Sequence, residues 1–278
     1  MDALTILLAP AILITLMILS HTYLGLHVLE RGIIFVDLAV AQVAALGMSV
    51  AFLLGMDAHG LTAQLLALLS TFVAAFGLAF LRRARDKTTR EVAIGCAYVI
   101  ATAAAIVILS RTNQGMEELK GMLNGNVLWV QWKDIVLLLA VYAVLAVLHI
   151  VFFQRFLELS SRSESQKGHF VWEFLFFASF AIVITLAVNL VGVLLVFASL
   201  IVPAFAASFV TGTFKGRLLL GWLLGLIAGI SGLIVSYLAD LPTGSAVVCA
   251  LGILPIIALA IRSALGMSQG APVKVDVP

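Results

Sequence analysis

The stretch that decides the fold covers residues 174–210 and reads FLFFASFAIVITLAVNLVGVLLVFASLIVPAFAASFV. It contains no charged side chain, and it is nearly twice the roughly 20 apolar residues that an α-helix needs to cross a bilayer. It consists of two nearly continuous apolar runs, residues 174–190 and 192–210, which form a helical hairpin or one broken unit. Pro203 predicts a kink in the second run, because proline removes a helical hydrogen bond.

The rest of the chain has the same character. Hydrophobic residues make up 63% of it and charged residues 11%, against about 25% charged in a soluble protein. Backbone groups in hydrocarbon must be satisfied internally, so the apolar runs are helices. The composition therefore predicts an all-α polytopic membrane bundle with lipid as its main partner. A net charge of +2 excludes the strong field that gathers nucleic acid.

Apolar runs of near-spanning length recur along the chain. They are residues 4–20, 33–54, 61–81, 92–110, 135–153, 174–190, 192–210, 218–238 and 246–261. The near-continuity of the sixth and seventh gives the count a margin of one. We predict about nine transmembrane helices in one domain of residues 1–266, followed by a flexible cytoplasmic tail of residues 267–278.

The basic residues predict the orientation. If the loop of residues 82–91 is cytoplasmic, alternation puts the N-terminus outside and the C-terminus inside. Thirteen of the 16 Lys and Arg residues then lie on the cytoplasmic side and three outside. This asymmetry is typical of membrane proteins, whose cytoplasmic loops are rich in positive charge.

Two loops are long enough to serve a partner. The outer loop, residues 111–134, contains Trp129 and Trp132, and it is either a connector with an interfacial aromatic belt or a docking surface. The inner loop, residues 154–173, reads QRFLELSSRSESQKGHFVWE. It is charged and Ser-rich with aromatic ends, so a short amphipathic segment there could lie on the membrane or fit a partner's groove.

Ionisable residues at membrane depth are costly and are treated as functional candidates. Asp37 lies near the start of the second run and Gln42 five residues later, 140° around a regular helix. Asp37 shares a stripe with Glu30 and His27 if the helix extends back that far. Their oxygen and imidazole ligands suit a divalent cation. These four residues are our candidates for a transport pathway.

Each polar residue also has a structural explanation. Asp37 could pair with Arg31, and Gln42 could make a hydrogen bond between helices. His149 fits a residue that snorkels to the interface better than a ligand. Glu91 fits a cap at the start of its own helix, beside Arg90.

Other motifs indicate packing and exclude chemistry. Gly221, Gly225 and Gly229 recur at every fourth position, a pattern that lets membrane helices approach closely. The GxxxxGK[ST] motif of a P-loop is absent, and residues 212–217 (GTFKGR) lack its spacing. If ATP drives this protein, the ATPase is therefore another chain. Cys96 and Cys249 indicate neither a disulfide framework nor a zinc cluster.

Four segments in the right order carry a resemblance over nearly the whole chain. They are EVAIGCAY (residues 91–98), GNVLWVQWKDIV (125–136), GVLLVFASLIVPAFAA (192–207) and SYLADLPTG (236–244). With the hydropathy profile, they make the chain similar to the permease subunits of ABC importers for zinc, manganese and chelated iron.

The resemblance implies a multi-pass protein of the bacterial inner membrane that pairs with a second permease copy. Cytoplasmic ATPase subunits would bind at the inner loop, residues 154–173, and an extracytoplasmic metal-binding protein at the outer loop, residues 111–134. The chain would be a transport subunit and not an enzyme. It would hold no permanent cofactor, since the divalent metal is the transported substrate.

The presumed ion site departs from the family pattern. Similar permeases carry Gly-Asp-x-x-x-His in the second helix, whereas residues 35–47 read FVDLAVAQVAALG. Alignment on Gly47 puts Gln42 at the histidine position and Leu38 at the aspartate position, with Asp37 displaced by one. This displacement rotates the carboxylate by about 100°. A metal chelate or another small solute therefore joins the free metal ion as a possible substrate.

Two other classes of protein compete with a metal importer. A secondary transporter of a small solute is expected to show internal repeats and paired broken helices with midplane charges, and no convincing repeat is found. A non-transporting assembly or sensor component predicts that Asp37 and Gln42 have no effect on uptake.

Overall fold

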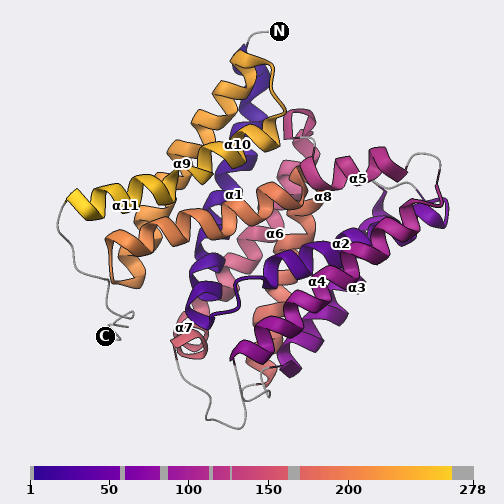
Figure 1. Ribbon diagram of the computed structural model, residues 1–278, viewed down its shortest axis with the longest axis horizontal. Coiled ribbons are helices and arrows are strands. Elements are labelled where there is room, and N and C mark those ends of the chain that lie inside the picture. The colour runs from indigo at the N-terminus through magenta and orange to yellow at the C-terminus, as the bar shows by residue number, and fades with distance from the viewer. Residues whose placement is uncertain are drawn as a thin grey trace. The chain divides into compact units, whose positions relative to one another are not determined.

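The structure is a computed structural model that describes residues 3–56, 60–81, 87–112, 115–125, 127–161 and 170–264, and all regular elements in these ranges are helical (Figure 1). The elements are α1 (Ala3–Arg31), α2 (Val36–Leu53), α3 (Leu61–Leu81), α4 (Lys87–Leu109), α5 (Gly115–Asn124), the 3₁₀ turn η1 (Val127–Trp129), α6 (Trp132–Val151), α7 (Phe153–Ser161), α8 (Phe170–Val210), α9 (Phe214–Ala239), α10 (Thr243–Gly252) and α11 (Leu254–Ala264). The predicted all-α fold is confirmed.

Among the described residues, eight helices are long and apolar enough to cross a membrane. They include the sixth and seventh predicted runs as one helix, α8, which accounts for the difference of one from the predicted count. Gly192 lies inside α8 with φ 79° and ψ 165°, so the break in helical dihedrals falls there and not at Pro203. The first run is also longer than predicted, because α1 continues to Arg31.

The chain divides into two compact units, and each is described by itself. Unit 1 comprises Met1–Glu30, Asn126–Val141 and Leu194–Pro278, and unit 2 comprises Arg31–Gly125 and Tyr142–Val193. The single membrane domain of residues 1–266 stays a prediction. The predicted tail of residues 267–278 lies outside the described residues.

In unit 1, the predicted glycine ridge of α9 packs against α1. A Cβ atom added at Gly221, Gly225 or Gly229 would lie 2.7–2.8 Å from a methyl group of Thr22, Ile18 or Ile14, respectively. These helices therefore approach more closely than side chains on the ridge would allow. The ring of Pro203 also lies against Gly225, so the proline contributes to the same contact.

In unit 2, α2 packs against both α3 and α4. A Cβ atom added at Gly47 of α2 would lie 2.8 Å from the Cα atom of Ala67 in α3, so the two backbones approach closely. The hydroxyl of Thr185 in α8 donates to that of Thr71 in α3 over 3.0 Å, and both side chains are buried. The first contact joins α2 to α3, and the second joins α3 to α8.

Two glycines with positive φ meet in unit 2. Gly125, at the end of α5, has φ 63°, and Gly192 has φ 79°. A Cβ atom on Gly192 would lie 2.5 Å from the backbone nitrogen of Gly125, and one on Gly125 would overlap the carbonyl carbon of Val191. Two of the four resemblance segments therefore meet backbone to backbone.

We predict that Gly192→Ala lowers the free energy of unfolding in detergent by about 1–3 kcal/mol, because its φ and ψ lie in a region that essentially only glycine adopts. Gly77→Ala is the matched control, since no heavy atom would contact the added methyl group and alanine favours a helix. Thermal unfolding of both purified variants measures the difference. An equal effect of the two substitutions would contradict the strain at Gly192.

Candidate functional site

The structure divides the four predicted pathway residues between two helices. His27 and Glu30 lie in α1 and unit 1, whereas Asp37 and Gln42 lie in α2 and unit 2. The stripe that required one continuous helix is therefore wrong. Gly32 has φ 65° directly after Arg31, which is the usual way for glycine to end a helix.

Asp37 is a buried carboxylate in the first turn of α2. The residue is 1% exposed, and neither carboxylate oxygen has a protein donor in the geometry of a hydrogen bond. The helix dipole and the nearby backbone N–H groups of Asp37 and Leu38 favour a negative charge at this end, but an ionised group buried without a charged partner is still costly. Asp37 is therefore the strongest candidate for an ion contact among the predicted residues.

Glu91 of α4 lies at the same end of α2. Its Oε1 atom accepts a hydrogen bond from the backbone N–H of Phe35 over 3.0 Å, so Glu91 caps the start of α2. We had predicted that it would cap the start of its own helix. Its Oε2 atom is buried without a hydrogen bond, and its charge repels that of Asp37. Sequence reasoning missed this proximity, because the two carboxylates come from helices 54 residues apart.

Gln42 is buried but does not share a face with Asp37. Helix α2 is continuous from Val36 to Leu53, so no break corrects the 140° between the two positions. Across the residues that the structure describes, no group of three or more His, Cys, Asp and Glu side chains could hold a metal ion. The paired carboxylate and imidazole of similar permeases therefore have no equivalent in α2.

His27 and Glu30 make packing and charge contacts in unit 1. Glu30 Oε1 lies 2.8 Å from Nη1 of Arg217, and Nε of Arg217 donates to the carbonyl of Thr211 over 2.9 Å. His27 is buried against Tyr23 at 4.7 Å and Phe214 at 5.2 Å between ring centroids. These contacts hold the end of α1 to the start of α9.

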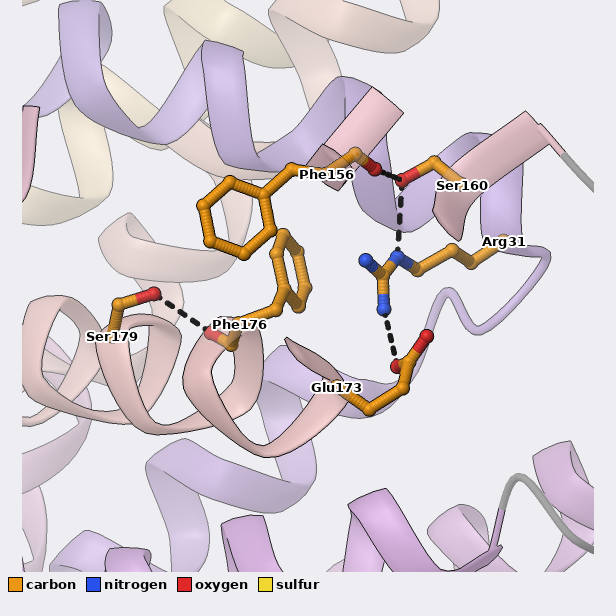
Figure 2. Close-up of polar contacts among 6 residues, drawn as sticks. All are labelled: Arg31, Phe156, Ser160, Glu173, Phe176 and Ser179. Carbon is orange, nitrogen blue, oxygen red and sulfur yellow. Dashed lines mark hydrogen bonds and ion pairs between the residues drawn. The ribbon is translucent and has the colours of Figure 1, made fainter. Parts of the chain in front are cut away.

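Arg31 pairs with Glu173 and not with Asp37, the pairing that we had considered (Figure 2). Its Nη1 atom lies 2.8 Å from Glu173 Oε2, and its Nε atom donates to Ser160 Oγ over 3.1 Å. The guanidinium carbon lies 3.7 Å from the ring centroid of Phe176. Sequence reasoning missed this buried site, because Ser160 and Glu173 are thirteen residues apart in the inner loop, which was expected to lie on the membrane or to fit a partner's groove.

His149 is buried beside this group and does not snorkel. Its Nε2 atom is 2.8 Å from Ser179 Oγ, and its ring stacks on Phe156 with 4.4 Å between centroids. Unit 1 holds a second buried imidazole that sequence reasoning passed over, since His21 Nδ1 lies 2.7 Å from Ser199 Oγ. Both histidines thus have a hydroxyl partner, which reduces the cost of their burial.

Comparison with known proteins gives matches along most of the chain. The model of the ABC 3 transport family matches residues 5–262. The chain is 25% identical over 230 residues to the manganese transport system membrane protein MntC of Listeria innocua, which covers 81% of this chain and 79% of that protein. It is also 25% identical over 232 residues to the manganese import system permease protein ScaB of Streptococcus gordonii, covering 81% and 80%.

Two solved structures are similar in fold. PsaBC from Streptococcus pneumoniae, in complex with Fab, has a TM-score of 0.75 at 22% identity and covers 93% of both chains. A metal-chelate type ABC transporter in an inward-facing conformation has a TM-score of 0.65 at 16% identity and covers 95% of this chain and 88% of that one. At these identities the likeness concerns the fold alone.

The contact between Glu30 and Arg217 predicts a coupled loss of stability. We expect Glu30→Gln and Arg217→Gln each to lower the free energy of unfolding by about 1.5–3 kcal/mol, the range for hydrogen bonds to charged groups, and the double variant to lose less than the sum. Arg155→Gln is the control, because its contact with Glu158 is 4.0 Å and exposed. Additive losses in thermal unfolding would contradict the pairing.

Proposed function

Because the chain belongs to the ABC 3 transport family, we propose that it is the membrane-spanning permease of an ABC importer for divalent metal ions. A separate ATPase chain would power it. The observation that carries the proposal is the extent of the family match, residues 5–262, together with relatives named as manganese permeases.

The chain is a multi-pass protein of the bacterial inner membrane, with apolar helices along its length. The absence of a P-loop in the sequence supports an ATPase on another chain. Two cytoplasmic ATPase subunits, a second permease copy and an extracytoplasmic metal-binding protein would complete the importer. The outer loop that includes α5 would receive the binding protein, and the inner loop that includes α7 would contact the ATPase.

We propose Mn²⁺ as the preferred substrate. Asp37 offers carboxylate oxygens and Gln42 an amide oxygen, and oxygen ligands suit manganese better than zinc, which binds imidazole well. The two residues lie on different faces of α2, so each would contact the ion at a different point of its path. Metal is cargo here, and no permanently bound cofactor is required.

Glu30 and His27 are assigned to packing and not to the pathway. Glu30 is engaged by Arg217, and His27 lies between two aromatic rings. A metal ion at either residue would have to compete with these contacts. Asp37, by contrast, is buried without a hydrogen bond, which supports a role that a passing cation completes.

Transport would follow alternating access. ATP binding and hydrolysis in the partner chain would move the segment around α7, and the helices would close one side of the pathway as the other opens. The outward-open and inward-open states need different helix contacts, and the cycle of ATP binding and hydrolysis would favour each state in turn.

The permease should co-purify with an ATPase chain, and the complex should take up Mn²⁺ into liposomes only with ATP. Uptake by the permease alone on an ion gradient would contradict the proposal and favour a secondary transporter. Complete absence of transport by an intact complex would favour an assembly or sensor role.

We predict opposite effects of Asp37→Asn on transport and on stability. Uptake at low Mn²⁺ should fall roughly tenfold to a hundredfold, because contacts to a charged group are worth about 1.5–3 kcal/mol. The free energy of unfolding should stay the same or rise, because the substitution removes a buried charge without a hydrogen bond. Uptake of radioactive Mn²⁺ and thermal unfolding measure the two effects.

Asp240→Asn is the matched control, since Asp240 is exposed and asparagine tolerates its φ of 52°. The double variant Asp37→Ala, Gln42→Ala should keep its association with the ATPase and lose uptake. Unchanged uptake in this variant would remove both residues from the pathway.

A further inference from the structure

An ion pair is buried at the end of α1, where it is expected to add little to the stability of the fold. Arg31 and Glu173 have side chains that are only 7% and 2% exposed. Taking two charges out of water costs about as much as their attraction returns, so a buried pair is weak evidence for stability. What distinguishes this pair is the set of helices that it connects.

Arg31 bonds to two helical segments of the inner loop, the end of α7 and the start of α8. Ser160 lies in the last turn of α7, and Glu173 lies in the first turn of α8, thirteen residues further along the chain. Arg31 itself is the last residue of α1. One guanidinium thus holds the last turn of α7 and the first turn of α8 to the end of α1 (Figure 2).

The geometry requires arginine. Nη1 contacts the carboxylate, Nε contacts the hydroxyl, and the flat face lies over the ring of Phe176. Lysine keeps the charge but has neither the planar fork nor the delocalised face, so it cannot make these three contacts together. Arg31→Lys therefore separates the shape of the cation from its charge.

Helix α7 has an outer and an inner face. Arg155 and Glu158 are exposed on the outer face, where a partner can reach them. Phe156 and Ser160 are buried on the inner face, and Phe156 lies 6.0 Å from Phe176 between ring centroids. A push on the outer face of α7 therefore reaches Arg31 through Ser160 and through the Phe156–Phe176 contact.

The residue before Arg31 is tied elsewhere. Glu30 pairs with Arg217 of α9, and the peptide bond between Glu30 and Arg31 is where the chain passes from unit 1 to unit 2. Gly32, with φ 65°, follows at once. Glu30, before this bond, is thus tied to α9, and Arg31, after it, is tied to α7 and α8.

We propose that Arg31 is the positioning residue that transmits movement of α7 to α1 and α8, and so couples ATP hydrolysis to transport. The proposal rests on the proposed function, because it assigns α7 to the segment that an ATPase moves. Arg31 contacts neither substrate nor nucleotide in this scheme. It acts by holding the last turn of α7 and the first turn of α8 to the last residue of α1.

The test compares Mn²⁺ uptake with ATP hydrolysis in the intact permease–ATPase complex in liposomes. For Arg31→Lys we expect the number of Mn²⁺ ions taken up per ATP to fall about tenfold, within the range of coupling between distant sites, while ATP hydrolysis continues. Ser160→Ala and Glu173→Gln should each lower the same ratio. Neither should lower it further in the Arg31→Lys background, because all three changes break one unit.

Arg217→Lys is the matched control, because it makes the same substitution in the other Arg–Glu pair at the end of α1. It should lower thermal stability and leave the ratio of uptake to hydrolysis unchanged. If Arg31→Lys lowers thermal stability and keeps the wild-type ratio, the pair is structural and the inference is overturned. If the wild-type complex shows no ATP-dependent uptake of Mn²⁺ or of Zn²⁺, the proposed function itself has failed.

Discussion

A backbone N–H or C=O in hydrocarbon has no water to bond with, and this constraint governs every level of the structure. It makes the membrane segments helical. Between such helices the hydrophobic effect is weak, so close packing replaces it. Gly25 of α1 shows how close the approach is, since a Cβ atom there would overlap the carbonyl oxygen of Leu200. The hydroxyls of Ser49 and Ser70 donate to carbonyls four residues earlier in their own helices.

The same constraint explains how charge is arranged. Arg31 meets Glu173 and Glu30 meets Arg217. The buried imidazoles of His21 and His149 each meet a serine hydroxyl. Within the described residues, both side-chain oxygens of Asp37 and both side-chain polar atoms of Asn189 are buried without the geometry of a hydrogen bond. Asp37 is the ionisable one of these two, which suits a protein that moves cations, because a partner already in place would compete with the cargo.

The sequence pattern predicted the features that depend on residues close together in the chain. The apolar runs predicted the helices, the glycines at 221, 225 and 229 predicted a close contact, and four short segments predicted the family, which is confirmed. Partners of charged groups could not be predicted in this way, because they depend on helices far apart in sequence. Glu91 was expected to cap its own helix and instead caps α2, and Arg31 was considered for Asp37 and instead binds Glu173. The proposed stripe failed for a local reason, since Gly32 ends α1 before it can reach Asp37.

The break at Gly192 also bears on whether the number of membrane crossings is odd or even. An unbroken helix of 41 residues would be about 60 Å long, roughly twice the thickness of the hydrocarbon core. Gly192 divides α8 into segments of residues 170–191 and 193–210, each close to the length of one crossing. Two crossings would make the total odd and agree with the opposite sides that the basic residues predict for the two termini, whereas one crossing would put both termini on the same side. The predicted orientation of the chain therefore depends on Gly192, the residue of α8 with non-helical dihedral angles.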